Sequence, residues 1–236
     1  MAPLLVEGVV FDLDATLVNL GGFVEWEEAH RRATEAYIAC GCPEDLIHRC
    51  SEKGLFSMLN LVRDELSKTL PSSKVERIQM DAYRAVESCE AEGVAECHLM
   101  PDCLPSLEWL RDKGIKMGVA TSNSEGVAER ILAIKGIRSY FAALVGRRAG
   151  LRMKPYPDQI LRCFAEMDID PAMGVVVGDS VRDVRAAKSA GIFAIAVPSH
   201  FTRRRLLEEA GVDRVIENLG ELSKVVSELN HGQVTG

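Results

Sequence analysis

Four short apolar runs recur along the chain without the alternation of polar and apolar residues that marks a half-exposed strand. Valine and isoleucine dominate these runs, which read LLVEGVVF, IKMGVAT, MGVVVGD and IFAIAV. Such runs suit parallel strands that are buried on both faces of a sheet. Helical patterns lie between the later runs and stop at glycines such as Gly114, Gly136 and Gly191. One pattern places Leu104, Leu107 and Leu110 on an apolar stripe, and the next places Val127, Ile131 and Ile134 on another. This alternation predicts a doubly wound parallel sheet, a Rossmann-like α/β fold.

The segment from residue 18 to about residue 95 interrupts the alternation. It contains no clear strand pattern, but it holds amphipathic helical stretches punctuated by Gly41, Pro43, Gly54, Pro71 and Gly93. A chain of 236 residues is long enough for a sizeable core and an inserted subdomain. We therefore predict an all-helical insert over residues 18–95 and an α/β catalytic core made of residues 1–17 and 96–236.

Composition and charge narrow the class of protein. Hydrophobic residues make up 47% and charged residues 27% of the chain, and the formal net charge of −7 argues against non-specific nucleic-acid binding. No stretch is long and apolar enough to span a bilayer, and the first residues lack the basic region of a signal peptide. We expect a cytoplasmic monomer or homodimer that binds neither nucleic acid nor membrane. Its seven cysteines, which include no CxxC pair, are expected to be reduced thiols.

Polar residues gather at the carboxyl ends of three apolar runs. These ends read Asp12-Leu13-Asp14-Ala15-Thr16, Thr121-Ser122-Asn123 and Gly178-Asp179-Ser180, and Asp183 follows the last of them. Ligands of open α/β sheets bind outside the carboxyl ends of the strands, so these side chains should share one crevice. Lys154 directly precedes a proline in the segment RMKPYPDQI, on a loop that can face the same crevice.

The chemistry of these residue types points to a metal ion and a phosphate. Three carboxylates cannot crowd together in ionised form without a counter-charge, and Mg²⁺ with oxygen ligands supplies one. A threonine hydroxyl and a lysine ammonium are what a phosphoryl group needs. Asp12 and Asp14, two positions apart, leave a strand on the same face, so both can flank one phosphorus atom. One acid can then bind metal and attack, while the other manages a proton.

The motifs together resemble the haloacid dehalogenase superfamily. DxDxT, a strand-end Thr, a Lys before Pro and GDSxxD occur in the order of that family. The helical insert directly after the first motif resembles the subfamily with a small helical cap, whose members include phosphoglycolate phosphatase and β-phosphoglucomutase. The resemblance spans nearly the whole chain and implies a helical cap over the core.

The resemblance implies a role for each matching position. Asp12 would be the nucleophile that forms an aspartyl-phosphate, and Asp14 would be the general acid and then the general base, a contribution typically worth about 10²–10⁴ in rate. Thr121, Ser122 and Lys154 would hold the substrate phosphate.

The same resemblance implies a Mg²⁺ site. Asp12, Asp179 and the main-chain carbonyl of Asp14 would be its protein ligands, and Asp183 would support the water shell of the ion. The implied activity is that of a Mg²⁺-dependent phosphatase acting on a small phosphorylated metabolite, such as phosphoglycolate or a sugar phosphate. A phosphomutase of the β-phosphoglucomutase type and a non-catalytic phosphate-binding protein stay open as alternatives.

Three features of this chain concern the insert and its connection. Arg49 and Lys53, which flank the turn at Gly54, are candidates for contacting an anionic substrate from the cap. Two glycines in the segment LVNLGGF predict a hinge about which the cap moves as a lid. Asn19, close to this hinge, stands where many relatives have Asp and is a further candidate to alter substrate contacts.

The first motif itself departs from the family at one position. Ala15 stands where the family usually has Gly, and a positive φ there would cost about 1 kcal/mol. We expect this substitution to be tolerated rather than to inactivate an enzyme.

Overall fold

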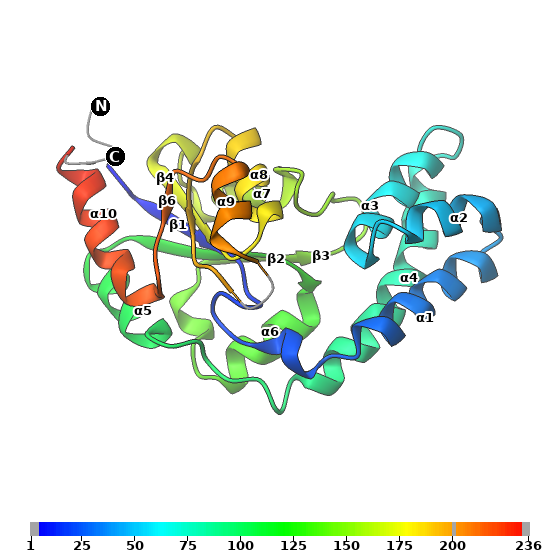
Figure 1. The fold of residues 1–236 in the computed structure, drawn as a ribbon, viewed down its shortest axis with the longest axis horizontal. Coiled ribbons are helices and arrows are strands. Elements are labelled where there is room, and N and C mark those ends of the chain that lie inside the picture. Colours follow the sequence, from blue (N-terminus) through cyan, green and yellow to red (C-terminus); the bar gives the residue numbers. More distant parts are fainter. Residues whose placement is uncertain (1–4, 200–201, 233–236) are drawn as a thin grey trace.

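A computed structural model describes residues 5–199 and 202–232, and its centre is a six-stranded sheet with the order β3-β2-β1-β4-β5-β6. All pairings among these strands are parallel, which confirms the predicted doubly wound sheet (Figure 1). The strands are β1 (Gly8–Phe11), β2 (Lys116–Ser124), β3 (Ala143–Arg147), β4 (Gly174–Gly178), β5 (Phe193–Ala196) and β6 (Arg214–Val215). Four of them match the predicted runs, although Leu4, where the first run begins, lies outside the described residues.

Helices cover both faces of the sheet, as expected for strands without alternation. They are α5 (Cys103–Asp112), α6 (Glu125–Ile134), α7 (Asp158–Met167), α8 (Val181–Ser189), α9 (Arg204–Glu209) and α10 (Leu222–Asn230), with single 3₁₀ turns at η2 (Arg138–Tyr140), η3 (Pro171–Met173) and η4 (Leu219–Glu221). Along β1, Val9 and Phe11 join the hydrophobic cluster under α5, α6 and α10, while Val10 joins the cluster under α7, α8 and α9. Alternate residues of one strand therefore fill two cores.

The helical stripes differ in detail from the sequence expectation. Leu104 and Ile134, which were expected to share the apolar stripes of their helices, are 38% and 59% exposed. In α5 the buried positions are Cys103, Ser106, Leu107 and Leu110, which follow the i, i+3, i+4, i+7 spacing. Leu104 lies outside this stripe, because a strict three-residue repeat drifts around a helix that has 3.6 residues per turn.

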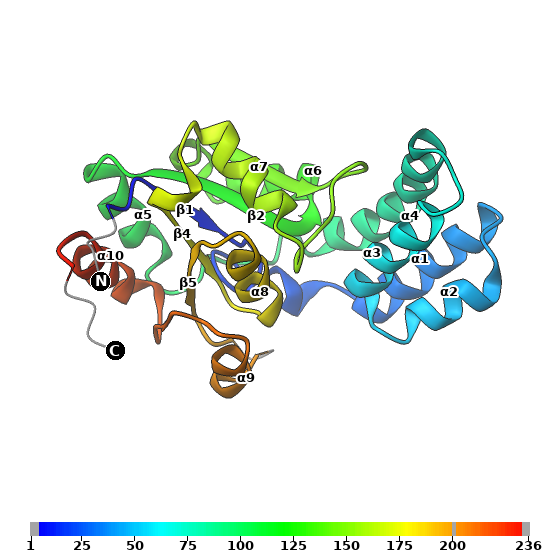
Figure 2. The same cartoon turned by 90° about the horizontal axis from the view of Figure 1, so that it is seen from above.

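Four helices form a separate group at one end of the molecule, and this group is called the cap below (Figures 1 and 2). They are α1 (Trp26–Ala39), α2 (Glu44–Ser51), α3 (Leu55–Leu66) and α4 (Ser72–Gly93), preceded by the short 3₁₀ turn η1 (Leu20–Phe23). Helix α1 packs along α4 through small and aromatic side chains at Ala29, Ala33 and Tyr37. We keep residues 18–95 as the proposed extent of this unit.

The two chain segments that join the cap to the core are hydrogen-bonded to each other. The amide of Asn19 donates to the carbonyl of His98 at 3.1 Å, and the amide of Met100 donates to the carbonyl of Leu17 at 2.9 Å. The amide of His98 in turn donates to Oδ1 of Asn19 at 2.5 Å. Asn19 thus ties the two segments together in this structure.

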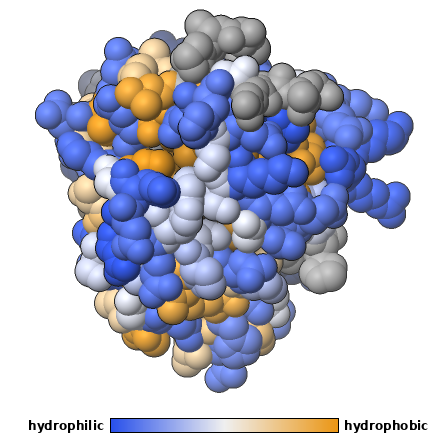
Figure 3. Space-filling model, turned by 90° about the vertical axis from the view of Figure 1, so that its left-hand side faces the viewer, coloured by the Kyte–Doolittle hydropathy of each residue, from blue (hydrophilic) through white to orange (hydrophobic). Residues whose placement is uncertain are grey.

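None of the described helices is both long and apolar enough to cross a membrane. The face turned away from the cap carries hydrophobic residues interspersed with hydrophilic ones (Figure 3). All seven cysteines lie in the described part of the chain, and all are free.

Candidate active site

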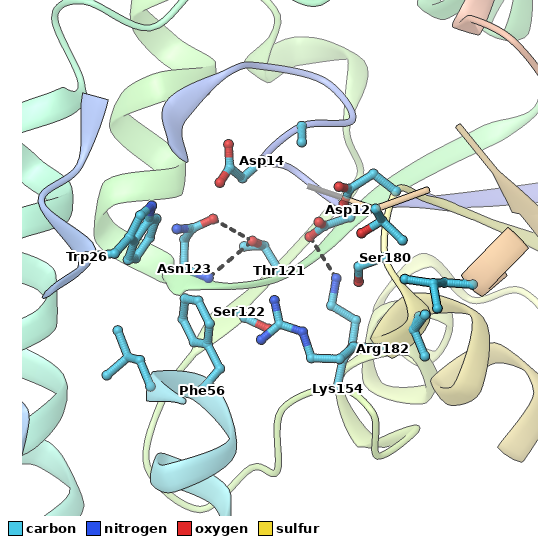
Figure 4. Close-up of a pocket in the computed structure, with 16 residues that line it drawn as sticks. Asp12, Asp14, Trp26, Phe56, Thr121, Ser122, Asn123, Lys154, Ser180 and Arg182 are labelled. Carbon is cyan, nitrogen blue, oxygen red and sulfur yellow. Dashed lines mark hydrogen bonds and ion pairs between the residues drawn. The ribbon is translucent and has the colours of Figure 1, made fainter. Parts of the chain in front are cut away.

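A pocket of about 480 Å³ opens at the carboxyl ends of the central strands, beside the cap. Its walls include the predicted site residues Asp12, Asp14, Thr121, Ser122, Lys154 and Asp179. They come from three strand ends and one loop, as the sequence predicted (Figure 4). Asp183, the remaining core residue of the prediction, is buried directly behind this wall and pairs with Lys154.

Asp12 follows β1 and continues its pairing with β4, because its amide donates to the carbonyl of Val177 at 2.8 Å. The chain then turns sharply. The amide of Ala15 donates to the carbonyl of Val18 at 2.6 Å, so it is already engaged within the turn. Ala15 itself has a φ of +58°, which is the left-handed conformation that favours glycine.

Replacing Ala15 with glycine is expected to stabilise the protein. Relief of the left-handed strain, about 1–2 kcal/mol, exceeds the added entropy of an unfolded glycine, about 0.4–1 kcal/mol. The net gain of about 0.5–1 kcal/mol should raise the Tm by about 1–4 °C in a thermal melt. A lower Tm would show that the alanine side chain contributes packing that outweighs its strain.

Lys154 connects two of the carboxylates. Its Nζ lies 2.7 Å from Oδ1 of Asp12 and 2.5 Å from Oδ1 of Asp183, and its side chain is only 4% exposed. Burial by itself lowers the pKa of Lys154, but the charges of the two carboxylates outweigh this effect and raise the pKa above its ordinary value. The ammonium therefore stays protonated and positively charged at the floor of the pocket.

The pKa values of the buried carboxylates are shifted in different directions. Burial raises the pKa of Asp12, against the opposing charge of Lys154. Asp183 is buried as well, but Lys154 and the Ser180 hydroxyl hold its pKa below the ordinary value. Asp183 also forms a capping box with Ser180 at the start of α8, so it has a structural role in addition to its pairing.

Asp14 lies in a different environment from Asp12. Its Oδ1 accepts a hydrogen bond from the amide of Gly21 at 2.7 Å, and its carboxylate is turned away from Asp12 and Lys154 (Figure 4). Burial raises the pKa of Asp14 to about 6, even though the Gly21 amide opposes this shift. A Cβ atom at Gly21 would lie 2.5 Å from Oδ2 of Asp14, so glycine is needed at this close approach. An acid with this pKa can hold and release a proton near neutral pH.

Three carboxylates are placed so that they fit a hard divalent cation. Oxygen atoms of Asp12, Asp179 and Asp183 lie within 4.8 Å of one another, and the donor set contains oxygen alone. Burial raises the pKa of Asp179 to about 8, with further contributions from Asp183 and Asp12, although Ser199 donates a hydrogen bond to Asp179 at 2.6 Å. Asp179 is thus an acid that lacks a compensating positive charge, as a metal ligand does before its cation is bound.

The carboxyl-terminal end of β2 carries hydroxyls suited to a phosphate. Oγ of Ser122 is buried and has no hydrogen-bond partner among the described residues. Oγ1 of Thr121 donates to Oδ1 of Asn123 at 3.0 Å and accepts from the amide of Asn123 at 3.1 Å (Figure 4). A phosphate oxygen in the pocket would give Ser122 the partner that it lacks.

A buried ion pair that no sequence pattern marks lies behind the end of β2. Nη1 and Nη2 of Arg147, at the end of β3, donate to the two oxygens of Glu90 from α4 at 2.9 and 2.8 Å, and both side chains are 0% exposed. Glu90 also accepts hydrogen bonds from the Asn123 side chain at 3.1 Å and from the Ser124 amide at 3.0 Å. One cap carboxylate therefore anchors the end of β2, which carries Thr121.

Two further buried polar residues position the Lys154 loop and were also missed. The side chain of Asn60, from α3, exchanges two hydrogen bonds of 3.1 Å with the main chain of Met153. The side chain of Gln159 accepts from the Lys154 amide at 3.3 Å and donates to the Thr121 carbonyl at 2.7 Å. Burial of Asn and Gln inside amphipathic helices leaves no distinctive spacing, so no sequence signal marked them.

The two cap cations predicted to contact a substrate lie elsewhere, and the structure corrects this placement. Arg49 has a 71% exposed side chain that pairs with Asp45 at 3.6 Å, and Lys53 is exposed. Neither residue lines the pocket. The reason is the orientation of α2, which buries Ile47 and Cys50 and so turns Arg49 toward solvent. The cap contributes Trp26, Leu55 and Phe56 to the pocket instead.

Comparisons with known proteins show which family the chain is similar to. Residues 9–197 match the family model described as haloacid dehalogenase-like hydrolase. The protein CbbY of Cereibacter sphaeroides is 29% identical over 230 residues, which cover 92% of this chain and 94% of that protein. The phosphoglycolate phosphatase of Nitrosospira multiformis is 26% identical over 227 residues, covering 95% and 97% of the two chains.

Solved structures share the fold as well. CbbY from Rhodobacter sphaeroides in complex with phosphate aligns with a TM-score of 0.60 and 26% identity, over 92% of this chain and 96% of that chain. A variant of the same protein has been solved in complex with xylulose-1,5-bisphosphate.

Proposed function

Because this chain belongs to the haloacid dehalogenase-like hydrolase family, we propose that it is a Mg²⁺-dependent phosphatase that hydrolyses a small phosphate monoester through an aspartyl-phosphate on Asp12. The observation that carries this proposal is the placement of Asp12 beside Lys154, with oxygens of Asp179 and Asp183 within 4.8 Å. The relatives named phosphoglycolate phosphatase and CbbY support a small phosphorylated metabolite as the substrate.

Phosphoryl transfer to Asp12 would begin with a carboxylate oxygen of Asp12 attacking the phosphorus atom. The bond between phosphorus and the leaving oxygen breaks, and Asp14 gives its proton to that oxygen. Lys154 and the hydroxyls of Thr121 and Ser122 stabilise the charge on the transferring group. Asp14, now ionised, then takes a proton from the water that attacks the phosphorus, which releases phosphate and regenerates Asp12.

A bound Mg²⁺ would be held by Asp12 and Asp179, with Asp183 close behind, and would supply positive charge that offsets the carboxylates and the phosphate oxygens. The side chains of Trp26, Leu55 and Phe56 form the cap side of the pocket and exclude water from the reacting groups.

The direct test is release of inorganic phosphate by the intact protein, with Mg²⁺ and after thorough chelation. We expect release from an aryl phosphate and from small metabolites such as phosphoglycolate, and its loss on chelation. Turnover that continues unchanged without a divalent cation would refute the metal assignment. Phosphate binding without release would favour a non-catalytic protein.

Replacing Asp14 with asparagine should affect substrates according to their leaving groups. An alkyl phosphate needs a proton on the departing oxygen, so its turnover should fall by about 10²–10⁴. An aryl phosphate leaves readily, so phosphorylation of Asp12 should persist at a reduced rate and the phosphoenzyme should accumulate. The measurement is burst kinetics on both substrates, and equal losses without any phosphoenzyme would contradict the acid–base role.

Replacing Asp179 with asparagine should stabilise the metal-free protein in a pH-dependent way. The pKa of Asp179 rises from 3.8 to about 8 on folding. The contribution of Asp179 to the free energy of unfolding is therefore most favourable below pH 3.8 and is lost as the pH rises toward 8. The free energy of unfolding of the variant should exceed that of the wild type by about 2–4 kcal/mol at pH 8 and differ little at pH 4.

Urea unfolding without metal at the two pH values measures this difference. Mg²⁺ should raise the Tm of the wild type and leave that of Asp179→Asn nearly unchanged. The exposed Asp45→Asn serves as the control. A variant that is less stable than the wild type at pH 8 would show that Asp179 is already compensated by other groups.

A further inference from the structure

One cation in the pocket forms no ion pair with any of the described residues, although its charge acts on the neighbouring Asp183. Of the described residues that line the pocket, Lys154 and Arg182 are the cations, and Lys154 is already paired with Asp12 and Asp183. No carboxylate in the described part of the chain lies within 4 Å of the Arg182 guanidinium. Its central carbon lies 4.7 Å from the centre of the Phe56 ring, a contact between core helix α8 and cap helix α3.

The stability of α8 does not explain an arginine at this position. Arg182 is the second residue of the helix, where the helix dipole favours acidic rather than basic side chains. Asp183, directly after it, already provides the capping box. The helix dipole therefore disfavours a cation at this position, and the capping box of α8 does not need it.

The contact with Phe56 leaves the N–H groups of the Arg182 guanidinium available to bind a ligand. Figure 4 shows Arg182 between Phe56 and Ser122, with its guanidinium directed into the pocket. A guanidinium that stacks on an aromatic ring keeps its N–H groups in the plane of the fork, where they match two oxygens of a carboxylate or phosphate. Phe56 is in turn supported by the Trp26 ring, 5.5 Å away in an edge-to-face arrangement.

The charges of the pocket divide into two regions. The acids and Lys154 lie at the strand ends, where the transferred phosphate is proposed to bind. The cap wall of Trp26, Leu55 and Phe56 is uncharged, so Arg182 is the cation beside it. A pocket of about 480 Å³ is in the usual range for small molecules and has room for more than one phosphoryl group.

We propose that Arg182 is a specificity-determining residue that binds a second oxyanion of the substrate, apart from the phosphate that is transferred. The substrate class is then a small metabolite with two anionic groups, either a phosphorylated carboxylic acid or a bisphosphate. This proposal rests on the phosphatase function proposed above and adds the chemistry at the other end of the substrate.

The test compares Arg182→Gln with the wild type on four substrates in the presence of Mg²⁺. Two substrates carry a second anion: phosphoglycolate has a carboxylate, and a sugar bisphosphate has a second phosphate. The other two, 2-hydroxyethyl phosphate and an aryl phosphate, have only the phosphate that is transferred. We expect kcat/KM to fall about 10–100-fold for the two substrates with a second anion, mostly through KM, and less than about 3-fold for the other two. A larger loss for phosphoglycolate would identify the second anionic group as a carboxylate, and a larger loss for the sugar bisphosphate would identify it as a phosphate.

Two further variants complete the experiment. Arg185→Gln removes an exposed arginine of the same helix that does not line the pocket, and it should behave as the wild type on all four substrates. Arg182→Lys keeps the positive charge without the planar guanidinium, so its kcat/KM should lie between those of Arg182→Gln and the wild type. Aryl phosphate turnover reports whether each variant is folded.

The outcomes separate this inference from the proposed function. Equal losses on all four substrates, or no loss on any, would overturn the role of Arg182 while leaving the phosphatase intact. An absence of phosphate release from every substrate by the wild type would overturn the proposed function, and the role of Arg182 with it.

Discussion

Replacing Asp12 with asparagine is expected to lower kcat for every phosphate monoester by at least about 10⁴-fold. An amide is a poor nucleophile, and removal of a covalent nucleophile leaves only the contribution of binding and charge. The wild type should yield a phosphoenzyme that hydroxylamine cleaves, and the variant should yield none. Quench-flow with a labelled substrate measures the phosphoenzyme.

Loss of folding does not explain this expected result. Lys154 keeps its pairing with Asp183 in the variant, and one of three crowded acids is removed, so the Tm should not fall. Asp170→Asn, at an exposed turn far along the chain, is a control for the same chemical change. A phosphoenzyme on Asp12→Asn would place the nucleophile on another residue.

Replacing Glu90 with glutamine is expected to reduce the free energy of unfolding by about 3–5 kcal/mol. The substitution leaves the Arg147 guanidinium charged, fully buried and without its carboxylate, which is the costly half of a broken ion pair. For a chain of this length the Tm should fall by about 6–20 °C. Urea and thermal unfolding measure both quantities.

Matched variants separate the buried charge from other effects. Removing both partners in Glu90→Gln/Arg147→Met should recover much of the loss, because no unpaired charge is then buried. Glu35→Gln breaks an ion pair whose partners are 55% and 60% exposed and should cost less than about 0.5 kcal/mol. A loss below about 1 kcal/mol for Glu90→Gln would mean that water reaches Arg147.

The ends of the apolar strands are the part of the site that the sequence makes predictable. Asp12, Thr121 and Asp179 each follow a run that could only be a buried strand, and a parallel sheet brings such ends together. Strand β3 was not predicted, because Ala143–Arg147 offers only one strong strand former, Val145, among alanine, leucine, glycine and arginine. Strand β6 has two residues and leaves no pattern.

The contacts between cap and core were beyond the reach of spacing rules. Glu90 and Arg147 are 57 positions apart, and nothing local distinguishes them from the exposed charges around them. Charge and a place beside a glycine turn make Arg49 and Lys53 candidates in the sequence, but the packing of α2 turns Arg49 toward solvent, and Lys53 lies exposed beyond the end of that helix. Arg182 lies inside the GDSxxD motif, but no local pattern marks it, because its proposed role depends on Phe56, far away in the sequence.

The Glu90–Arg147 ion pair and the Asn60–Met153 hydrogen bonds join the cap to the core. They limit how the cap of such a chain can be exchanged for the cap of another protein. In a chimaera with foreign helices in place of α1–α4, Arg147 and the Met153 main chain would lose the carboxylate of Glu90 and the side-chain amide of Asn60. Exchange of the whole helical unit therefore requires matching changes in the core at the same time. Single replacements on the pocket wall, at Phe56 or Trp26, leave both pairings in place, so they are a simpler route by which such a chain can acquire a new substrate.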